Sequence, residues 1–464
     1  MSSFRFISRL NTEPLLELCK NTFTRSLSSQ TTGTIGIVRE ESNLWERRAP
    51  LSPLQVGQLV KQGNKVLVQP SDKRIFIKSE YERAGATFTD DLSEADLILG
   101  VKQLLLERVI PDKTYVIFSH TCKGQPANMP LLDTCIQENV RLIDYEMIVD
   151  ENKARLLAFG QFAGISGMIN ILYGMGIRLL GLGYQTPFLH LGLAHNYPQL
   201  AQAHGAVAQL GPYISSDGIP ASLGPMIFCF TGSGNVSRGA QSIFRLLPHE
   251  MVHPDDLKEV AENGETNHVY GTVVDAHHHL KHKGGLNFDL EHYLKNGSEY
   301  TSNFSTNIAP YISCLVNGVF WAPGHPRVLT DTDASSIQAG YGRLLAVVDV
   351  SNDLEGSIEF SRMLTTLDKP FAIYDSSKKQ YHEDFSGDGF LISNIDNLPT
   401  QLAIEATTFF GEELLSYIPD LMKVSRVKTL DDSSIRFPVR SAVVTFDKQL
   451  TPPFRYINDI RKDK

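Results

Sequence analysis

Short apolar runs alternate with helical patterns over residues 34–146. Apolar runs of about four to eight residues with polar boundaries are typical of strands buried on both faces of a parallel sheet. Ser52-Pro53 has the form of a helix start, with a capping serine and a proline in the first turn. The alternation therefore predicts βαβ units. The predicted strands cover 34–39, 65–69, 95–102, 114–120 and 141–146, and the predicted helices cover 53–60, 79–84 and 131–138.

The same α/β pattern resumes at the apolar run Met226–Phe230 and continues beyond Lys369. The segment 248–300 is polar and histidine-rich, and it is predicted to be an insertion of helices and loops. We expect an α/β fold of two Rossmann-like doubly wound domains with an interdomain cleft. The expected divisions are a catalytic or substrate domain of residues 34–159 and 370–464, a connector of 160–217, and a dinucleotide-binding domain of 218–369.

The stretch from Gln161 to Leu182 is apolar and rich in glycine. Its length is close to that of a membrane span, but Asn170 and Arg178 interrupt it. Small residues at helical spacing allow another backbone to approach closely. We therefore interpret the stretch as a buried helix that joins two domains, and we expect no membrane association.

Composition narrows the class of protein. The 464 residues carry a net charge of −9, which argues against a general nucleic-acid binder. The five cysteines are scattered and form no CxxC pair, so we expect a reducing compartment without a disulfide framework. Cys122 lies between two basic residues, where either a reactive thiol or a small filler is compatible with the sequence; the filler is the favoured interpretation.

Residues 1–30 differ from the rest of the chain. They combine basic residues, many serines and interspersed apolar residues, a composition typical of a mitochondrial transit peptide. Glu13 and Glu17 argue against that interpretation, because such peptides avoid acids. We expect a transit peptide over 1–30 and a location in the mitochondrial matrix.

Two neighbouring predicted strands each end in a base. One run finishes at Lys102 and the next at His120, with Lys123 just beyond. Ligands of open parallel sheets bind outside the carboxyl ends of the strands. The two bases are therefore candidates for one shared site, and their alternative role is that of ordinary polar strand ends.

A glycine-rich turn follows the strand that begins at Met226. Gly232 permits a tight turn, Gly234 allows close approach of a pyrophosphate, and the following helix directs unpaired N–H groups at it. Ser237 replaces the third glycine of the usual motif. Glu250 stands near the position of the acid that binds the ribose of NAD, whereas Arg238 could meet the 2′-phosphate of NADP, so spacing leaves the nucleotide open. The candidate cofactor residues are Gly232, Ser233, Gly234, Asn235, Val236, Arg238, Gly239 and Ser351.

Ordered motifs along the chain resemble one family. The segment from Ile37 to Pro53 is similar to the N-terminal motif of the alanine dehydrogenase and transhydrogenase superfamily. The runs 100–102, 118–125, 144–146, 155–160, 303–311, 317–321 and 348–351 resemble lysine-forming saccharopine dehydrogenases, in particular the lysine–ketoglutarate reductases of animals.

The resemblance implies an NADPH-dependent reductive condensation of L-lysine with 2-oxoglutarate to saccharopine, the first step of lysine degradation. An imidazole near neutral pKa suits the proton transfers of imine formation. We assign His120 as the principal acid–base and Lys102 as the second catalytic residue. The substrates carry several carboxylates, which call for cations. The candidate substrate-binding residues are Arg39, Lys123, Glu146, Arg155, Phe159 and Asp349.

The resemblance also implies partners. We expect a homo-oligomer and a saccharopine dehydrogenase domain in the same or another chain, because the family's reductase half is usually followed by that domain. One departure from related fungal enzymes is Gln103, where they have a glutamate after the catalytic lysine. The rival functions are an alanine dehydrogenase-like amino-acid dehydrogenase and a non-catalytic nucleotide-binding regulatory module. His277, His278 and His279 with His282 are interpreted as a solvated loop without a metal.

Overall fold

The computed structural model describes residues 32–462, which contain two large, separate sheets. The predicted transit peptide lies outside the described residues. The first sheet contains six strands, all parallel. In spatial order they are β3 (Thr87–Phe88), β2 (Lys65–Val68), β1 (Thr34–Ile37), β4 (Leu97–Leu99), β5 (Thr114–Ile117) and β6 (Arg141–Asp144).

The second sheet has eight strands, of which β14 pairs antiparallel with both of its neighbours. In spatial order they are β15 (Gln380–His382), β14 (Ala372–Asp375), β16 (Phe390–Ser393), β13 (Ala346–Asp349), β12 (Cys314–Asn317), β7 (Met226–Thr231), β9 (Val269–Val274) and β8 (His249–Met251). Two short antiparallel pairs complete the strands, β10 (Leu280–His282) with β11 (Tyr300–Ser302) and β17 (Thr445–Phe446) with β18 (Gln449–Leu450).

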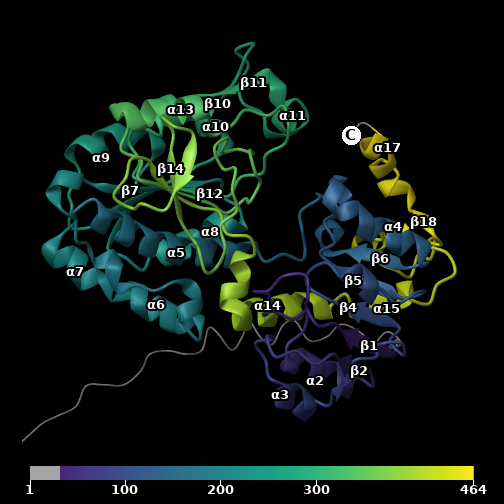
Figure 1. Ribbon diagram of the computed structural model, residues 1–464. Coiled ribbons are helices and arrows are strands. Elements are labelled where there is room, and N and C mark those ends of the chain that lie inside the picture. The colour runs from purple at the N-terminus through teal and green to yellow at the C-terminus, as the bar shows by residue number, and fades with distance from the viewer. Residues whose placement is uncertain (1–31, 463–464) are drawn as a thin grey trace, which may run out of the picture.

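Each sheet has its own helices, and the two sheets define a first and a second domain (Figure 1). The first domain contains α2 (Pro53–Lys61), α3 (Lys78–Arg83), α4 (Met129–Gln137), α14 (Ala403–Leu415), α15 (Ile418–Val424), α16 (Phe437–Arg440) and α17 (Ile457–Lys462). The second contains α5 (Gly160–Gly181), α6 (Leu200–Ala208), α7 (Leu210–Asp217), α8 (Asn235–Phe244), α9 (Leu257–Asn263), α10 (Ala276–His279), α11 (Leu290–Lys295), α12 (Phe304–Asn307) and α13 (Asp331–Ser336).

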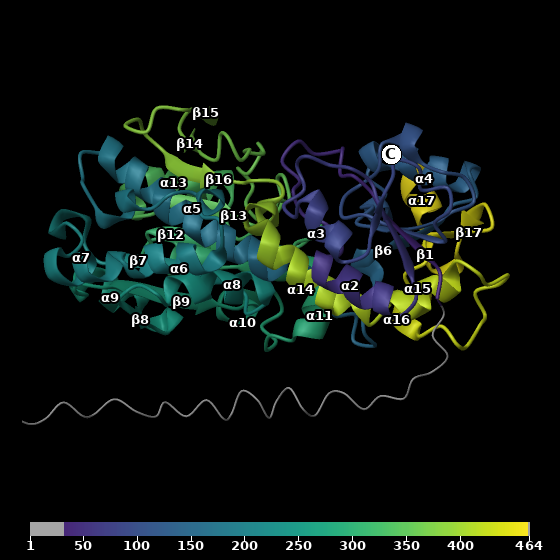
Figure 2. The same ribbon diagram turned by 90° about the horizontal axis from the view of Figure 1, so that it is seen from below.

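The chain returns to the first domain later than the sequence predicted. Strands β14 and β16 join the second sheet, so the expected boundary at residue 370 is wrong. The return is made by α14, which packs beside α2, and Val444 donates its N–H to the carbonyl of Leu142 in β6. Figure 2 shows the yellow C-terminal helices grouped with the purple and blue N-terminal strands.

Helix α5 belongs to the second domain rather than to a separate connector. It packs against α8, β13 and β16. Its apolar window would be long enough to cross a membrane, but 78% of that window is buried inside the protein. The interpretation of this stretch as a buried helix is therefore confirmed, whereas the connector expected over 160–217 is wrong for α5.

Glycines allow α5 and α8 to approach each other. A Cβ atom added at Gly164 would overlap the carbonyl of Val236, and one added at Gly239 would overlap the carbonyl of Gln161. The two helix backbones are therefore in direct contact beneath the turn that precedes α8. Gly239, predicted as a cofactor residue, is required here for helix packing.

The segment predicted as an insertion contributes strands to the second sheet. Strand β9 lies between β7 and β8 and pairs parallel with both. It is buried along most of its length, although its sequence contains the polar Thr272 and the small Gly271. The histidine run is also ordered differently from the prediction, because His277–His279 lie in α10 and His279 is buried.

Substitution of Gly164 by alanine should destabilise the protein. The added methyl group must displace backbone of α8, which we expect to cost about 1–3 kcal/mol. Unfolding in urea, followed by circular dichroism, measures the effect. The matched control is Gly205→Ala in α6, where a Cβ meets nothing within 4 Å; it should be neutral or stabilise by up to about 1 kcal/mol. Equal stabilities of the two variants would contradict the proposed contact.

Candidate active site

His120 lies at the carboxyl edge of the first sheet, three residues beyond β5. It adopts a left-handed backbone conformation with φ of 54°, and its carbonyl accepts a hydrogen bond from the amide of Asn128 at 2.9 Å. The imidazole Nδ1 lies 3.8 Å from the carboxylate of Glu146, and the ring stacks near Phe118. The turn thus holds a partly exposed imidazole with one nitrogen directed at an acid.

Glu146 follows β6, the next strand in the sheet. Its carboxylate lies 3.2 Å from the guanidinium of Arg155. Burial by itself raises the pKa of Glu146, but the nearby His120 and Arg155 outweigh it and hold that pKa at about 2. Glu146 is therefore an anion throughout the neutral range, and its carboxylate faces the imidazole of His120.

A buried acid connects the loop that carries His120 with the loop that carries Glu146. Asp144 is fully buried, and it accepts hydrogen bonds from the hydroxyl of Ser119 and from the N–H of Glu146. Burial and the neighbouring Glu146 raise the pKa of Asp144 to about 6. Because it bonds to both Ser119 and Glu146, Asp144 fixes the loop after β5 relative to the loop after β6.

Lys102 lies beyond β4, which is the parallel neighbour of β5. The buried carboxylate of Glu40 accepts the N–H groups of Val101 and Lys102, at 2.6 and 2.9 Å. Burial and the charge of Glu46 raise the pKa of Glu40 to about 7. The prediction that both bases follow neighbouring strands at one sheet edge is confirmed. Glu40, which holds the backbone at Lys102, was not identified from the strand ends.

Gln103 connects the two base-bearing loops. Its amide donates to the carbonyl of Ser119 at 2.6 Å and to the side chain of Asn128 at 2.8 Å, and Asn128 holds the carbonyl of His120. A neutral amide can donate both bonds, which a carboxylate cannot. Gln103, the departure from the fungal pattern, therefore helps to position the loop that carries His120.

Acids of the second domain face the bases of the first. The ammonium of Lys102 lies 3.7 Å from the carboxylate of Asp396, and that of Lys123 lies 3.9 Å from Asp353. Asp353 follows β13 and Asp396 follows β16, so both acids come from carboxyl ends of strands in the second sheet. These pairs place the site between the domains. Neither acid was predicted, although the strand-end rule applied to the second sheet points to them.

Two residues that were predicted to bind substrate contact other side chains of the protein. The guanidinium of Arg39 pairs with Glu41 at 3.2 Å and with Asp90 at 2.9 Å, and the structure does not bring it to His120. Asp349 is fully buried and accepts hydrogen bonds from Asn317 and from Ser351. Their roles in substrate binding stay predictions, and the same is true of Ser351 as a cofactor residue.

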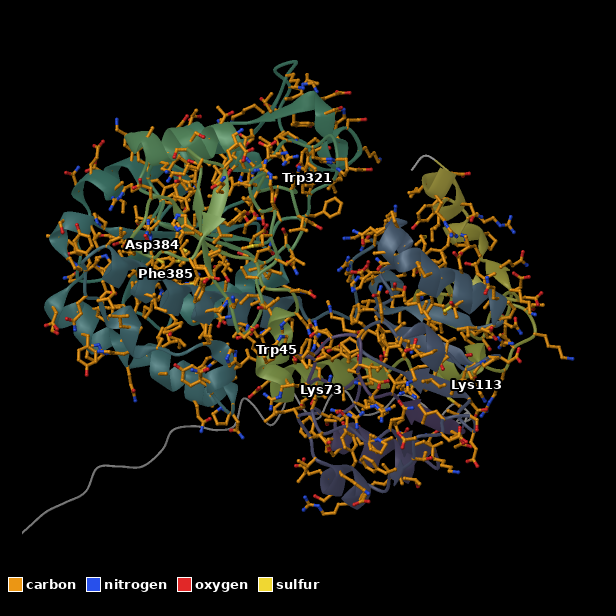
Figure 3. All side chains as sticks on the ribbon, viewed as in Figure 1. Trp45, Lys73, Lys113, Trp321, Asp384 and Phe385 are labelled. Atoms are coloured by element: carbon orange, nitrogen blue, oxygen red, sulfur yellow. The ribbon has the colours of Figure 1, made fainter. Side chains whose placement is uncertain are left out.

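Phe159 lies in an aromatic joint between the domains. Its ring stacks on Phe410 of α14 with centroids 4.5 Å apart, and the guanidinium of Arg48 lies 4.2 Å above it. Arg48 pairs with Glu46 at 2.7 Å, and Asn397 hydrogen-bonds to both. Figure 3 shows the adjacent Trp45 where the domains join, whereas Trp321 lies on the side of the second domain that faces the first.

The glycine-rich turn after β7 has the form of a phosphate cradle. Gly232 has φ of +74°, and a Cβ added at Gly234 would meet nothing within 4 Å. The turn is followed by the ten-residue α8, and Ser233 and Asn235 are exposed. An open turn at a helix N-terminus fits the pyrophosphate of a dinucleotide. Val236 packs close to Gly318, so this predicted cofactor residue also has a packing role.

Cys122 is a buried thiol beside this site. Burial and the neighbouring acids Asp144 and Glu146 raise its pKa. A thiol with a raised pKa is a poor nucleophile. The interpretation of Cys122 as a small filler is therefore favoured over that of a reactive group.

Comparison with solved structures defines the class of fold. An L-alanine dehydrogenase superposes with a TM-score of 0.58 at 18% identity, covering 92% of this chain and 99% of that chain. A transhydrogenase from Sinorhizobium meliloti gives 0.54 at 15% identity, covering 90% and 100%. Residues 36–166 match the family described as alanine dehydrogenase/PNT, N-terminal domain. The protein thus has the two-domain fold of alanine dehydrogenases and transhydrogenases, as predicted.

Sequence relatives identify the family within that class. The L-lysine-forming saccharopine dehydrogenase [NAD(+)] of Yarrowia lipolytica is 32% identical over 406 residues, which are 84% of this chain and 92% of the relative. The chain belongs to the family of lysine-forming saccharopine dehydrogenases. The mitochondrial α-aminoadipic semialdehyde synthase of Mus musculus is 46% identical over 440 residues, 92% of this chain and 48% of the relative. The chain therefore spans about half the length of that synthase.

Removal of the buried charge at Glu46 should destabilise the protein in a pH-dependent way. Glu46→Gln leaves Arg48 buried without its counter-ion, which we expect to cost about 3 kcal/mol or more. Burial raises the pKa of Glu46, but Arg48 and Asn397 lower it to about 2, below the ordinary 4.5. The stabilisation is therefore complete above about pH 5 and is lost as the pH falls from 4.5 towards 2.

Unfolding free energies of wild type and Glu46→Gln at pH 7, 5 and 3.5 measure this difference, which should shrink at the lowest pH. Glu291→Gln is the control, because Glu291 pairs with Lys295 in a highly exposed helix position. It should change stability by less than about 0.5 kcal/mol at any pH. A Glu46→Gln cost that is as small as the control's would refute the assigned role.

Proposed function

We propose that this protein condenses L-lysine with 2-oxoglutarate and reduces the resulting imine to saccharopine. The observation that carries the proposal is the arrangement of His120, Glu146 and Lys102 at one sheet edge, opposite acids of the second domain. Imine formation needs attack by a neutral amine, loss of water and several proton transfers. A partly exposed imidazole backed by a carboxylate provides a carrier for those protons.

The carboxylate of Glu146 determines which nitrogen of His120 can exchange a proton with the substrate. The carboxylate faces Nδ1, so it favours the tautomer with a proton on that atom and leaves Nε2 to accept or donate a proton at the substrate. When Nε2 takes up a proton, the charge of Glu146 stabilises the imidazolium. Lys102 is the second proton carrier, and its ammonium lies 3.7 Å from the carboxylate of Asp396.

The charges on the two domains match the substrates. Lys123 and Arg155 are cations that suit the carboxylates of 2-oxoglutarate, and Arg155 offers the bidentate geometry that carboxylates prefer. Asp353 and Asp396 are acids that suit ammonium groups of lysine. A substrate that carries both charges would replace the weak ion pairs between the domains, which lie 3.7 and 3.9 Å apart.

The relatives support a pyridine nucleotide as cofactor, which supplies a hydride when bound. The turn of Gly232, Ser233 and Gly234 with Asn235 would hold its pyrophosphate. The family resemblance favours NADPH, whereas the Yarrowia relative is named for NAD(+).

The names of the relatives bear on the location of the protein in the cell. The synthases of Mus musculus, Bos taurus and Rattus norvegicus are named mitochondrial, which supports a mitochondrial location and, as a finer proposal, the matrix. A homo-oligomer and a saccharopine dehydrogenase domain in the same or another chain stay predictions.

Oxidation of the reduced nucleotide should require both lysine and 2-oxoglutarate. Absorbance at 340 nm, with each substrate omitted in turn and with pyruvate and ammonia as the alternative pair, measures this. Turnover without lysine would point to an alanine dehydrogenase-like activity, and no turnover at all would favour the regulatory module.

His120→Ala should lower kcat by about 100- to 10,000-fold, because it removes the main proton carrier. The matched control is His190→Ala, an exposed histidine of the second domain next to Tyr213, which should retain wild-type turnover. Near-normal kcat in His120→Ala would refute the role of His120 and leave the reaction itself unaffected.

A further inference from the structure

A cavity lies beside the joint where Arg48 contacts Phe159. Its volume is about 350 Å³, which is in the range of binding sites for small molecules, and such sites favour domain interfaces. Arg47 and Ile75 line it from the first domain, and residues 195–198 line it from the second. Residues 401–405, where α14 begins, complete the wall. We call this space the joint cavity.

The joint cavity is separate from the candidate active site. His120, Glu146 and Lys102 are not among the residues that line it. Glu405 belongs to α14 and accepts the N–H of Leu200, the first residue of α6, at 2.8 Å. Figure 1 shows α6 and α14 in the lower half of the molecule, whereas α11 and α17 lie in the upper half. A ligand in the joint cavity would therefore leave the positions of the reacting groups free.

Two opposite charges line the joint cavity without pairing with each other. The backbone N–H of Arg47 bonds to Thr400, but the guanidinium has no hydrogen-bond or ionic partner among residues 32–462. Glu405 holds the N–H of Leu200 with one carboxylate oxygen and pairs with no cation in that same part of the chain. The separation of the two charges leaves room for a molecule that carries both.

Hydrogen bonds determine which atoms of Gln401 and His195 can bind a ligand. The side-chain oxygen of Asn170 accepts the N–H of Ala194 at 2.8 Å, so its amide nitrogen is the donor to Oε1 of Gln401 at 3.2 Å. Nδ1 of His195 lies 3.1 Å from the same oxygen and must donate to it. Nε2 of the neutral imidazole is therefore an acceptor. Nε2 of Gln401 is a buried donor without a partner among the described residues, and such a donor is costly to leave unpaired.

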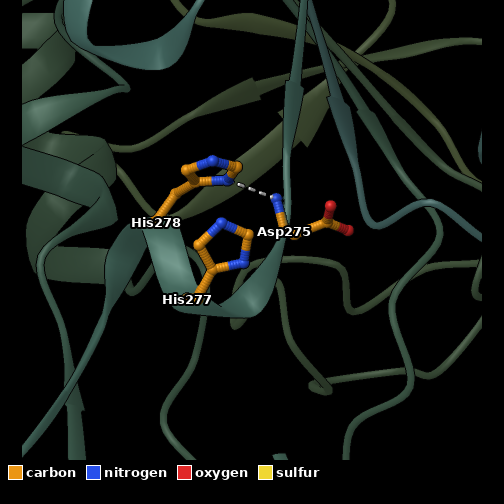
Figure 4. A group of neighbouring side chains, drawn as sticks. All are labelled: Asp275, His277 and His278. Atoms are coloured by element: carbon orange, nitrogen blue, oxygen red, sulfur yellow. Dashed lines mark hydrogen bonds between the residues drawn. The ribbon is translucent and has the colours of Figure 1, made fainter. Parts of the chain in front are cut away.

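Two histidines of the polar insertion lack a free nitrogen of this kind. Figure 4 shows the carboxylate of Asp275 turned away from the imidazoles of His277 and His278. Nδ1 of His278 accepts the N–H of Asp275 at 2.9 Å. Nδ1 of His282 accepts the N–H of Gly284 at 2.9 Å. A neutral imidazole that accepts at one nitrogen carries its proton on the other, so neither ring offers a lone pair to a metal ion.

We propose that the joint cavity binds a free α-amino acid with an aliphatic side chain. Arg47 and the amide nitrogen of Gln401 hold its carboxylate, because both are donors without a partner. Glu405 and Nε2 of His195 accept from its ammonium group. The apolar residues that line the cavity for its side chain include Ile75, Leu402 and Ile404. The inference does not depend on the proposed function.

L-Leucine is the probe, because it lacks the ε-amine of lysine and cannot replace that substrate. Isothermal titration calorimetry of the purified protein, without lysine or 2-oxoglutarate, should show saturable binding. N-Acetyl-L-leucine has no ammonium group and L-leucinamide has no carboxylate, so each should bind about tenfold or more weakly. L-Leucine should also raise the midpoint of thermal unfolding, because it binds only the folded protein.

Arg47→Met and Glu405→Gln test the two charges separately. Arg47→Met should weaken leucine binding about tenfold and leave leucinamide binding unchanged, because leucinamide has no carboxylate to lose. Glu405→Gln keeps an acceptor for the N–H of Leu200. It should weaken leucine binding about tenfold and leave N-acetyl-leucine binding unchanged. The matched control is Arg245→Met, at an exposed arginine that ends α8, which should bind leucine as the wild type does.

No saturable binding of leucine, equal binding of the three probes, or undiminished leucine binding in both variants would overturn the inference. Leucine binding that is lost in Arg155→Met but kept in Arg47→Met would place the ligand in the candidate active site and would overturn it as well. Should Arg47→Met fail to fold, as judged by circular dichroism, Glu405→Gln with the N-acetyl probe decides. Leucine binding without lysine-dependent turnover would leave the inference standing and overturn the proposed function instead.

Discussion

The buried ion pair between Glu46 and Arg48 fixes the joint on which the site depends. The chain passes between the domains near Phe159, which precedes α5, and again near Asn397, which precedes the helices that return to the first domain. Arg48 contacts both crossing points, the first through the ring of Phe159 and the second through the amide of Asn397. A displacement of this joint would move every acid of the second domain relative to the bases of the first.

The ion pair of the joint is buried, whereas the ion pairs that cross the site are partly exposed. This difference explains how charged side chains of the site can exchange one ionic partner for another. Glu46 and Arg48 are buried, so breaking their pair leaves an uncompensated charge. The pairs that cross the site are longer and partly exposed, and ion pairs of that kind contribute little. Charged groups of a ligand could therefore replace these two ion pairs at small cost, while the joint holds the two domains in place.

Much of this arrangement was predictable because strand ends in parallel sheets follow a simple rule. Lys102 and His120 were found from apolar runs that stop at a base, and Glu146 follows the next run. Glu40 was missed because its role depends on two backbone N–H groups from a strand about sixty residues away, which no local pattern reveals. For Arg39 the sequence left two roles open, because only the fold determines whether a cation at a strand end has partners; here Glu41 and Asp90 pair with it.

The second sheet shows why order along the chain is a poor guide to the nucleotide. Counting about twenty residues from the glycine-rich turn assumes that the next strand along the chain is the next strand in space. Here β8 is the next along the chain but lies at the edge of the sheet, and β9 is inserted between it and β7. The polar, histidine-rich sequence around β9 hid a strand that the backbone hydrogen bonds place directly beside β7, the strand that leads into the glycine-rich turn. The strand next to the glycine-rich turn is therefore identified by its register with β7, and register is a property that only the folded sheet supplies.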